Sequence, residues 1–148
     1  MNAFEKLKLT DDDMLAVYGM LLYEESGCAK RITDAGGIDS ADEKDVAICE
    51  WVVRCFRNRL VCGSSISDIC AWDSGNPGII KAKNFGERIS DIMRKFCLNI
   101  IKGNNYFFVE KVAKKYFYDG LNEGGITENW YNHLYAACMF YGGVDRGY

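Results

Sequence analysis

The stretch that decides the fold reads SADEKDVAICEWVVRCFRNRL, residues 40–60. Ser40 and Glu43 have the three-residue spacing of a capping box, which predicts that a helix begins here. Behind them, apolar residues recur at intervals of three and four, the period of one helix face. The members of this face are Val46, Cys49, Val52, Val53, Phe56 and Leu60, and Ile48, Trp51 and Cys55 widen it. An apolar arc this wide predicts a central helix with several neighbours, and Gly63 is expected to end it.

The chain before residue 40 predicts one long helix and one short one. Thr10 and Asp13 form another capping box, and apolar residues follow at helical spacing as far as residue 22. We therefore expect a helix over residues 11–26 that ends at Gly27. Residues 28–40 are expected to hold a short helix that breaks at the paired glycines of positions 36 and 37.

The chain after residue 63 repeats the helical pattern. Two helical turns are expected over residues 65–72, and residues 73–78, DSGNPG, form the clearest loop. Asn76 as the cap and Pro77 at the first helical position would begin the next helix. The apolar spacing from Phe85 to Ile100 predicts a long amphipathic helix that ends at Gly103. Two more helices are expected, one from residue 104 or 105 to residue 120 and one beginning near residue 127.

The number of residues and their pattern limit the fold class. The chain has 148 residues, of which 49% are hydrophobic and 26% charged. This is enough for one domain with a substantial core and too little for two ordinary domains. Alternating patterns typical of strands are scarce. The sequence therefore predicts a single all-α domain over residues 1–148, a compact bundle of six to eight short amphipathic helices.

The charge balance and the apolar runs limit the expected partners. A net charge of -3 gives no general attraction to phosphate backbones, so nucleic acid is not an expected partner. Basic residues gather at Arg54, Arg57 and Arg59, which we interpret as a solvated helix face. No apolar run approaches the roughly 20 residues that span a bilayer, and the first residues lack the apolar core of a signal peptide. We expect no integral membrane anchor and a cytoplasmic location.

The chain offers little for catalysis or metal binding. It has seven cysteines and a single histidine, His133, and no two cysteines form a C-x-x-C pair. The cysteine spacing is typical of helix-core positions, so we expect buried thiols in a reducing compartment, no metal and no cofactor. A Cys–His dyad with His133 is the less favoured alternative, and we expect no enzyme activity. Methionines and aromatic residues on short helices favour a groove that binds a partner's helix.

Several segments resemble motifs of the Bcl-2 family of apoptosis regulators, in particular its short, divergent viral members. Residues 84–89, NFGERI, resemble the first homology motif, Asn-Trp-Gly-Arg followed by an apolar helix, with Phe85 at the Trp position and Glu87 inserted before Arg88. Residues 126–135, ITENWYNHLY, resemble the second motif, and residues 32–36, ITDAG, the third. A second register, with residues 86–89 as the third motif and residues 129–130 as the first, stays open.

The resemblance implies a Bcl-2-like bundle that sequesters the BH3 helix of a pro-apoptotic protein in a surface groove and so inhibits apoptosis. Arg88 matches the arginine that pairs with an aspartate of the ligand. The other expected groove residues are Phe56, Phe85, Gly86, Ile89 and Ile92. A viral member would act in the host-cell cytosol, and formation of a homodimer stays open. The alternatives are a helical protein that blocks another host factor or neutralises a toxin and, less favoured, a small Cys/His hydrolase.

Overall fold

The computed structural model describes residues 7–61, 63–71, 77–102, 108 and 111–112, and this part of the chain is helical. Its helices are α1 (Asp11–Asp34), α2 (Glu43–Val61), α3 (Ile66–Ala71), α4 (Ile79–Gly86) and α5 (Asp91–Ile101). Within these ranges there is no strand, which confirms the all-α prediction. Of the two helices expected beyond residue 103, only residues 108 and 111–112 are described, and the Val112 N–H donates to the Phe108 carbonyl at 2.8 Å as in a helix. The single domain over residues 1–148 stays a prediction.

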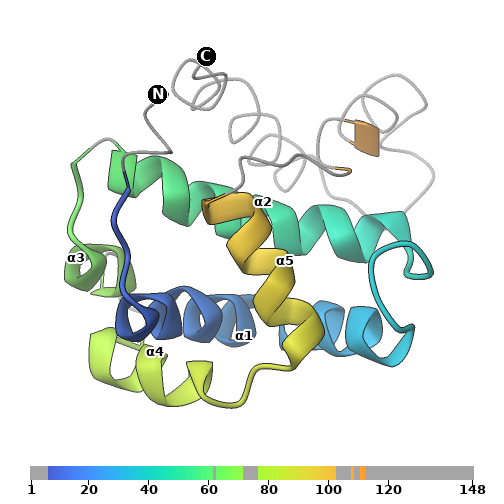
Figure 1. Ribbon diagram of the computed structural model, residues 1–148, viewed down its shortest axis with the longest axis horizontal. Helices are drawn as coiled ribbons and strands as arrows, with labels where there is room; N and C mark the ends of the chain where they lie inside the picture. Colours follow the sequence, from blue (N-terminus) through green and yellow to red (C-terminus); the bar gives the residue numbers. More distant parts are fainter. Residues whose placement is uncertain (1–6, 62, 72–76, 103–107, 109–110, 113–148) are drawn as a thin grey trace.

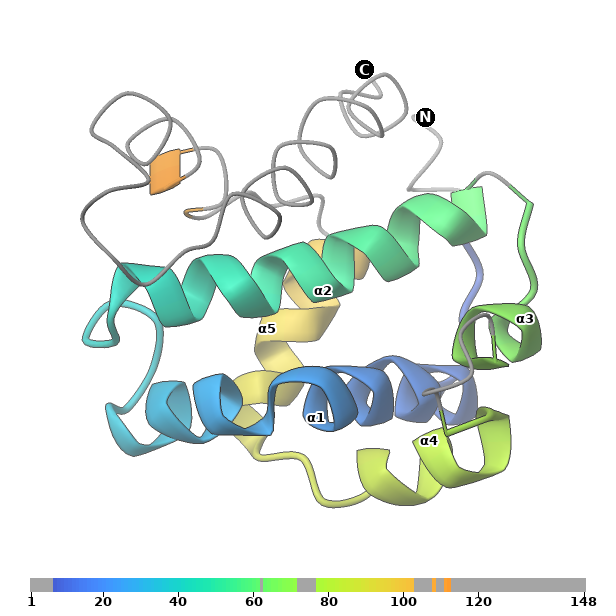
Figure 2. The same ribbon diagram turned by 180° about the vertical axis from the view of Figure 1, so that it is seen from behind.

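Helices α1 and α2 lie beside each other and run in opposite directions, and α5 crosses both (Figure 1, Figure 2). Helix α4 packs on the side of α1 that faces away from α2, and it runs in the same direction as α1. The core fills the space where α1, α2 and α5 meet. Its buried apolar side chains from these helices include Met14, Val17, Leu21, Val46, Val53, Phe56, Met93, Phe96 and Ile100.

Helix α1 begins as predicted, is interrupted near the predicted end of the first helix and then continues to Asp34. The Thr10 hydroxyl accepts a hydrogen bond from the Asp13 N–H, and the Asp13 carboxylate accepts one from the Thr10 N–H, both at 3.0 Å, which confirms the capping box. The helical dihedral angles are interrupted at Glu25, whose φ of -141° and ψ of 50° are not helical, two residues before the predicted end at Gly27. A second helical stretch follows as far as Asp34, which confirms the predicted short helix, although it directly continues the first. Ile32 and its neighbours in the second half are buried, so packing outweighs the low helix propensity of glycine.

The end of α1 and both ends of α2 are set by local chemistry. Gly37, with a φ of 138°, donates its N–H to the Ile32 carbonyl, so the chain does leave α1 at the paired glycines. The predicted Ser40–Glu43 capping box is wrong, because α2 begins at Glu43 itself. Asp42 caps α2 instead, since its carboxylate accepts the Lys44 N–H at 2.8 Å. The predicted end at Gly63, with a φ of 100°, is confirmed.

The region of α3, α4 and α5 differs most from the prediction. Two turns after residue 65 are confirmed as α3, but α4 begins at Ile79 behind Gly78, so the predicted start at Pro77 is wrong. The predicted long helix over residues 85–103 is also wrong, because α4 ends at Gly86 and α5 begins at Asp91. Ser90 causes the new start, since its hydroxyl accepts the Met93 N–H at 3.2 Å and caps α5.

Two glycines allow α1 and α4 to approach with their backbones in contact. A Cβ atom on Gly19 would overlap the carbonyl group of Ala82, and one on Gly86 would overlap the carbonyl group of Leu15. Small residues spaced four apart on one helix are the usual means of such a close approach. The Gly86 of the NFGERI segment therefore has a packing role, which fixes α4 and the chain after it against α1.

Candidate functional site

The structure brings most of the predicted groove residues to the corner between α4 and α5. Phe85 and Gly86 end α4, Arg88 and Ile89 lie in the connection, and Ile92 lies in the first turn of α5. Phe56 lies apart from them on α2 and is buried in the core. Gly86 and Ile89 are also buried, Phe85 and Ile92 are half-buried, and Arg88 is exposed. Of the predicted groove residues at this corner, those that reach solvent are therefore Phe85, Arg88 and Ile92.

Arg88 is held in place by its backbone and its side chain. The Arg88 N–H donates to the Phe85 carbonyl at 3.0 Å, and the next N–H, that of Ile89, donates to the Gly86 carbonyl at 3.3 Å. The Arg88 guanidinium carbon lies 5.5 Å from the centre of the Phe85 ring, a cation–π distance. The buried side chain of Ile89 anchors the connection in the core. The charge of Arg88 is thus presented at a defined place.

Tyr23 of α1 continues this surface, and the sequence analysis missed it. Its ring lies 6.0 Å from the ring of Phe85, centre to centre, and the two planes are tilted by 55°. Tyr23 is 41% exposed, so it is one of the large hydrophobic side chains that reach solvent. Tyr23 lies near Phe85 because α1 and α4 cross. The spacing of residues along one helix does not predict such a contact between two helices. We call Tyr23, Phe85 and Arg88 the Arg88 surface.

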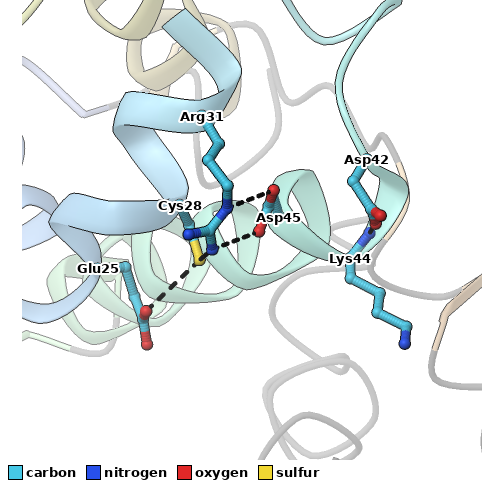
Figure 3. Close-up of polar contacts among 6 residues, drawn as sticks. All are labelled: Glu25, Cys28, Arg31, Asp42, Lys44 and Asp45. Atoms are coloured by element: carbon cyan, nitrogen blue, oxygen red, sulfur yellow. Dashed lines mark hydrogen bonds and ion pairs between the residues drawn. The ribbon is translucent and has the colours of Figure 1, made fainter. Parts of the chain in front are cut away.

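A second cluster ties the end of α1 to the beginning of α2. Figure 3 shows Arg31 of α1 reaching Asp45 of α2, with Cys28 between Arg31 and Glu25. The guanidinium donates to both carboxylate oxygens of Asp45, at 2.9 and 2.8 Å, and to the Cys28 sulfur at 3.3 Å. The Cys28 thiol lies 3.6 Å from a carboxylate oxygen of Glu25 and donates to it. The cluster therefore joins the interrupted part of α1 to its neighbour by a bidentate ion pair.

The electrostatics of this cluster indicate a structural role. The hydrogen bonds from Arg31 lower the pKa of Asp45, which keeps this carboxylate ionised. Burial raises the pKa of Glu25 and, with the nearby carboxylates of Glu25 and Asp45, raises the pKa of Cys28 to about 12. A thiol with that pKa is protonated at neutral pH and is a poor nucleophile. Cys28 acts as a hydrogen-bond donor and spacer between the two helices.

The basic residues of α2 do not form the predicted solvated face, so that prediction is wrong for Arg54 and Arg57. These side chains are 1% and 0% exposed. Arg54 lies 3.6 Å from the carboxylate of the equally buried Glu50, one turn before it. Arg57 donates to the Ile100 carbonyl at 2.8 Å, in the last turn of α5, where helix carbonyls lack partners within the helix. Burial of these charges follows from the α2–α5 contact, which composition does not reveal.

The described thiols are not activated for catalysis. Cys28, Cys49, Cys70 and Cys97 are buried, which confirms the prediction for these four, and Cys55 is half-buried. Burial is the largest cause that raises the pKa of each of the five, to about 12 for Cys55. Cys62, Cys138 and His133, the other members of a Cys–His dyad, lie outside the described residues. No group of three or more potential metal ligands occurs among the described residues.

The chain matches no protein family, no curated protein and no solved structure. In the part of the chain that the structure describes, none of the helices combines the length and apolar character needed to cross a bilayer.

Proposed function

We propose that this chain is a non-enzymatic helical protein that inhibits apoptosis by sequestering the BH3 helix of a pro-apoptotic protein. The observation that supports it is the Arg88 surface, where an exposed guanidinium is held over an aromatic ring. Ile92, four residues after Arg88 in the sequence, lies at the start of α5 and is half-buried. An amphipathic helix with an aspartate among its apolar residues has the complementary chemistry.

The energy of such an interaction would come from two sources. An arginine–aspartate pair that loses water on binding contributes about 1.5–3 kcal/mol. Apolar side chains of the ligand that cover Phe85 and Ile92 would add the burial of apolar surface. The backbone hydrogen bonds at Arg88 and Ile89 order this connection, and the contact with Phe85 restricts the guanidinium, which would reduce the entropy lost on binding.

The described residues offer weaker support for the hydrolase alternative. A thiol nucleophile needs a lowered pKa, whereas burial raises the pKa of every described cysteine for which a shift is resolved. A hydrolase of this chain would have to use Cys62 or Cys138 with His133. Alkylation of the thiols and His133→Ala would abolish turnover in that case.

Calorimetric titration with BH3 peptides tests the proposal. We expect micromolar or tighter binding of at least one peptide and a loss of about 10- to 100-fold with Arg88→Glu, the size of a charge-assisted pair. Lys95→Glu is the matched control. Lys95 is an exposed cation of α5, and its substitution changes the net charge by the same amount. Absence of binding at tens of micromolar across the common BH3 peptides would overturn the proposal, as would equal losses with the two variants.

A further inference from the structure

The Arg88 surface extends beyond the residues that the sequence pointed to, because α1 contributes Tyr23 to it. Tyr23, Phe85 and Arg88 come from α1, α4 and the α4–α5 connection, and each contacts the next: the Tyr23 and Phe85 ring centres are 6.0 Å apart, and the Arg88 guanidinium is 5.5 Å from the Phe85 ring centre. The Arg88 surface therefore consists of one exposed aromatic ring, one half-buried ring and one exposed cation.

The relative positions of these side chains are fixed by the helix crossing beneath them. Gly19 precedes Tyr23 by one turn of α1, and Gly86 directly follows Phe85. Both glycines lie against the backbone of the opposite helix, so the two helices pack closely beneath the surface. Lys83 of α4 also pairs with Asp12 of α1. A partner meets a preformed surface, which favours binding without rearrangement.

We infer that Tyr23 is a specificity-determining residue for a partner helix that carries an acidic residue and two apolar residues on one face. The acidic residue pairs with Arg88, one apolar residue covers Phe85, and the second contacts Tyr23. Residues three or four apart lie on the same face of an α-helix, so we expect both apolar residues of the partner within about two turns of its acidic residue.

This inference rests on the proposed function and deepens it by naming a contact from α1. Because Arg88 is the exposed cation of the surface, the partner residue that meets it is expected to be acidic. The exposed ring of Tyr23 favours an apolar partner residue. Covering an aromatic ring removes a large area from water, and few rotatable bonds are immobilised. A partner with a second acidic residue at that place would lose the contact.

A double-mutant cycle with a bound BH3 peptide tests the role of Tyr23. The peptide carries alanine, one position at a time, at each apolar residue within two turns of its aspartate, and affinity is measured by fluorescence polarisation. We expect Tyr23→Ala to weaken binding about 3- to 10-fold and to abolish the effect of alanine at one of these positions. Tyr23→Phe should retain the affinity, because the ring and not the hydroxyl makes the contact.

Ile80→Ala is the matched control, because Ile80 is an apolar residue of α4 that is 76% exposed and is not a member of the Arg88 surface. Tyr23→Gln provides a second variant of high helix propensity should the alanine variant fold poorly. If Arg88→Glu weakens binding while Tyr23→Ala and Tyr23→Gln change it less than twofold, the role of Tyr23 is refuted and the proposed function stands. If no BH3 peptide binds the unaltered chain, the proposed function and the role of Tyr23 are both refuted.

Discussion

Arg88 and Arg57 show how the surroundings of a guanidinium decide its role. Arg88 is exposed and stacked on Phe85, so its charge is available to a partner. Arg57 is fully buried and donates to the Ile100 carbonyl at the negative end of α5. A charged side chain is buried only where polar groups compensate for the loss of water. The two arginines therefore belong to a surface for partners and to the internal framework, respectively.

Among the described carboxylates, Glu25 is one whose charge opposes folding. Burial raises its pKa, so the folded chain binds a proton at Glu25 more tightly than the unfolded chain does. The sign follows from linkage: stability falls as pH rises from the ordinary glutamate pKa through the raised one, and it is regained when Glu25 is protonated. Glu25→Gln should therefore stabilise the fold at about pH 7 by a few tenths of a kcal/mol, a small gain because the carboxylate is partly exposed to solvent.

Urea denaturation at about pH 7 and about pH 4 measures this effect. The stabilisation by Glu25→Gln should shrink at the lower pH, where both states of the unaltered chain approach the neutral form. Glu87→Gln serves as the control, because Glu87 is exposed beyond the end of α4. A loss of stability at about pH 7 that shrinks at about pH 4 would contradict the prediction and show that the hydrogen bond from the Cys28 thiol to the carboxylate outweighs the cost of burying the charge.

At the scale of elements, α4 depends on glycine for its contact with α1. Gly86→Ala would place a Cβ atom against the Leu15 carbonyl, and backbone cannot give way as a flexible side chain can. We expect a loss of about 1–3 kcal/mol, the usual cost of overpacking, measured as a lower urea midpoint. The gain in helix propensity, at most about 1 kcal/mol, does not offset it.

Gly27→Ala tests whether that loss is due to the crossing. Gly27 is exposed within α1, and an added Cβ would meet only the Arg31 guanidinium at an ordinary 3.5 Å. This variant should be as stable as the unaltered chain or more stable by up to about 1 kcal/mol. Equal destabilisation by the two substitutions would contradict the role of the close approach.

The element boundaries that sequence predicted correctly are those set by local hydrogen bonds. The cap at Thr10 and the end at Gly63 involve residues within a few positions of one another, so their pattern is visible in the chain. The continuation of α1 past Gly27 depends on the burial of Ile32, and a tertiary contact overrides local propensity there. Ser90 divides a stretch of continuous apolar period, and its cap was not recognised.

The candidate site was predictable only in the part that one segment supplies. The NFGERI segment led to Phe85 and Arg88, which the structure places together. Tyr23 was missed because it approaches Phe85 across the α1–α4 crossing, and a single sequence does not show which helices meet. Arg54 and Arg57 were misinterpreted for the same reason, since their burial depends on neighbours distant in the chain. The residues of one segment can be identified from a single sequence, whereas the contacts between helices cannot.

At the scale of the molecule, α5 and the Arg31–Asp45 pair connect the two long helices. Helix α5 crosses α1 and α2 (Figure 1). Its Met93, Phe96 and Ile100 side chains are buried in the core. Arg31 and Asp45 join the same helices near the turn between them. Because these links share the same two helices, opening one of them exposes core that the others also protect. This arrangement predicts that α1, α2 and α5 unfold together.

Three buried cysteines report on this cooperativity, since Cys28, Cys49 and Cys97 lie on α1, α2 and α5. Alkylation in short pulses along a urea series, with each cysteine peptide quantified by mass spectrometry, should give one common midpoint. Asp45→Asn weakens the ion pair with Arg31, so in this variant Cys28 should be labelled at lower urea than Cys49 and Cys97. Early labelling of Cys28 in the unaltered chain would instead mean that the part of α1 beyond the interruption at Glu25 opens by itself, despite its bidentate link to α2.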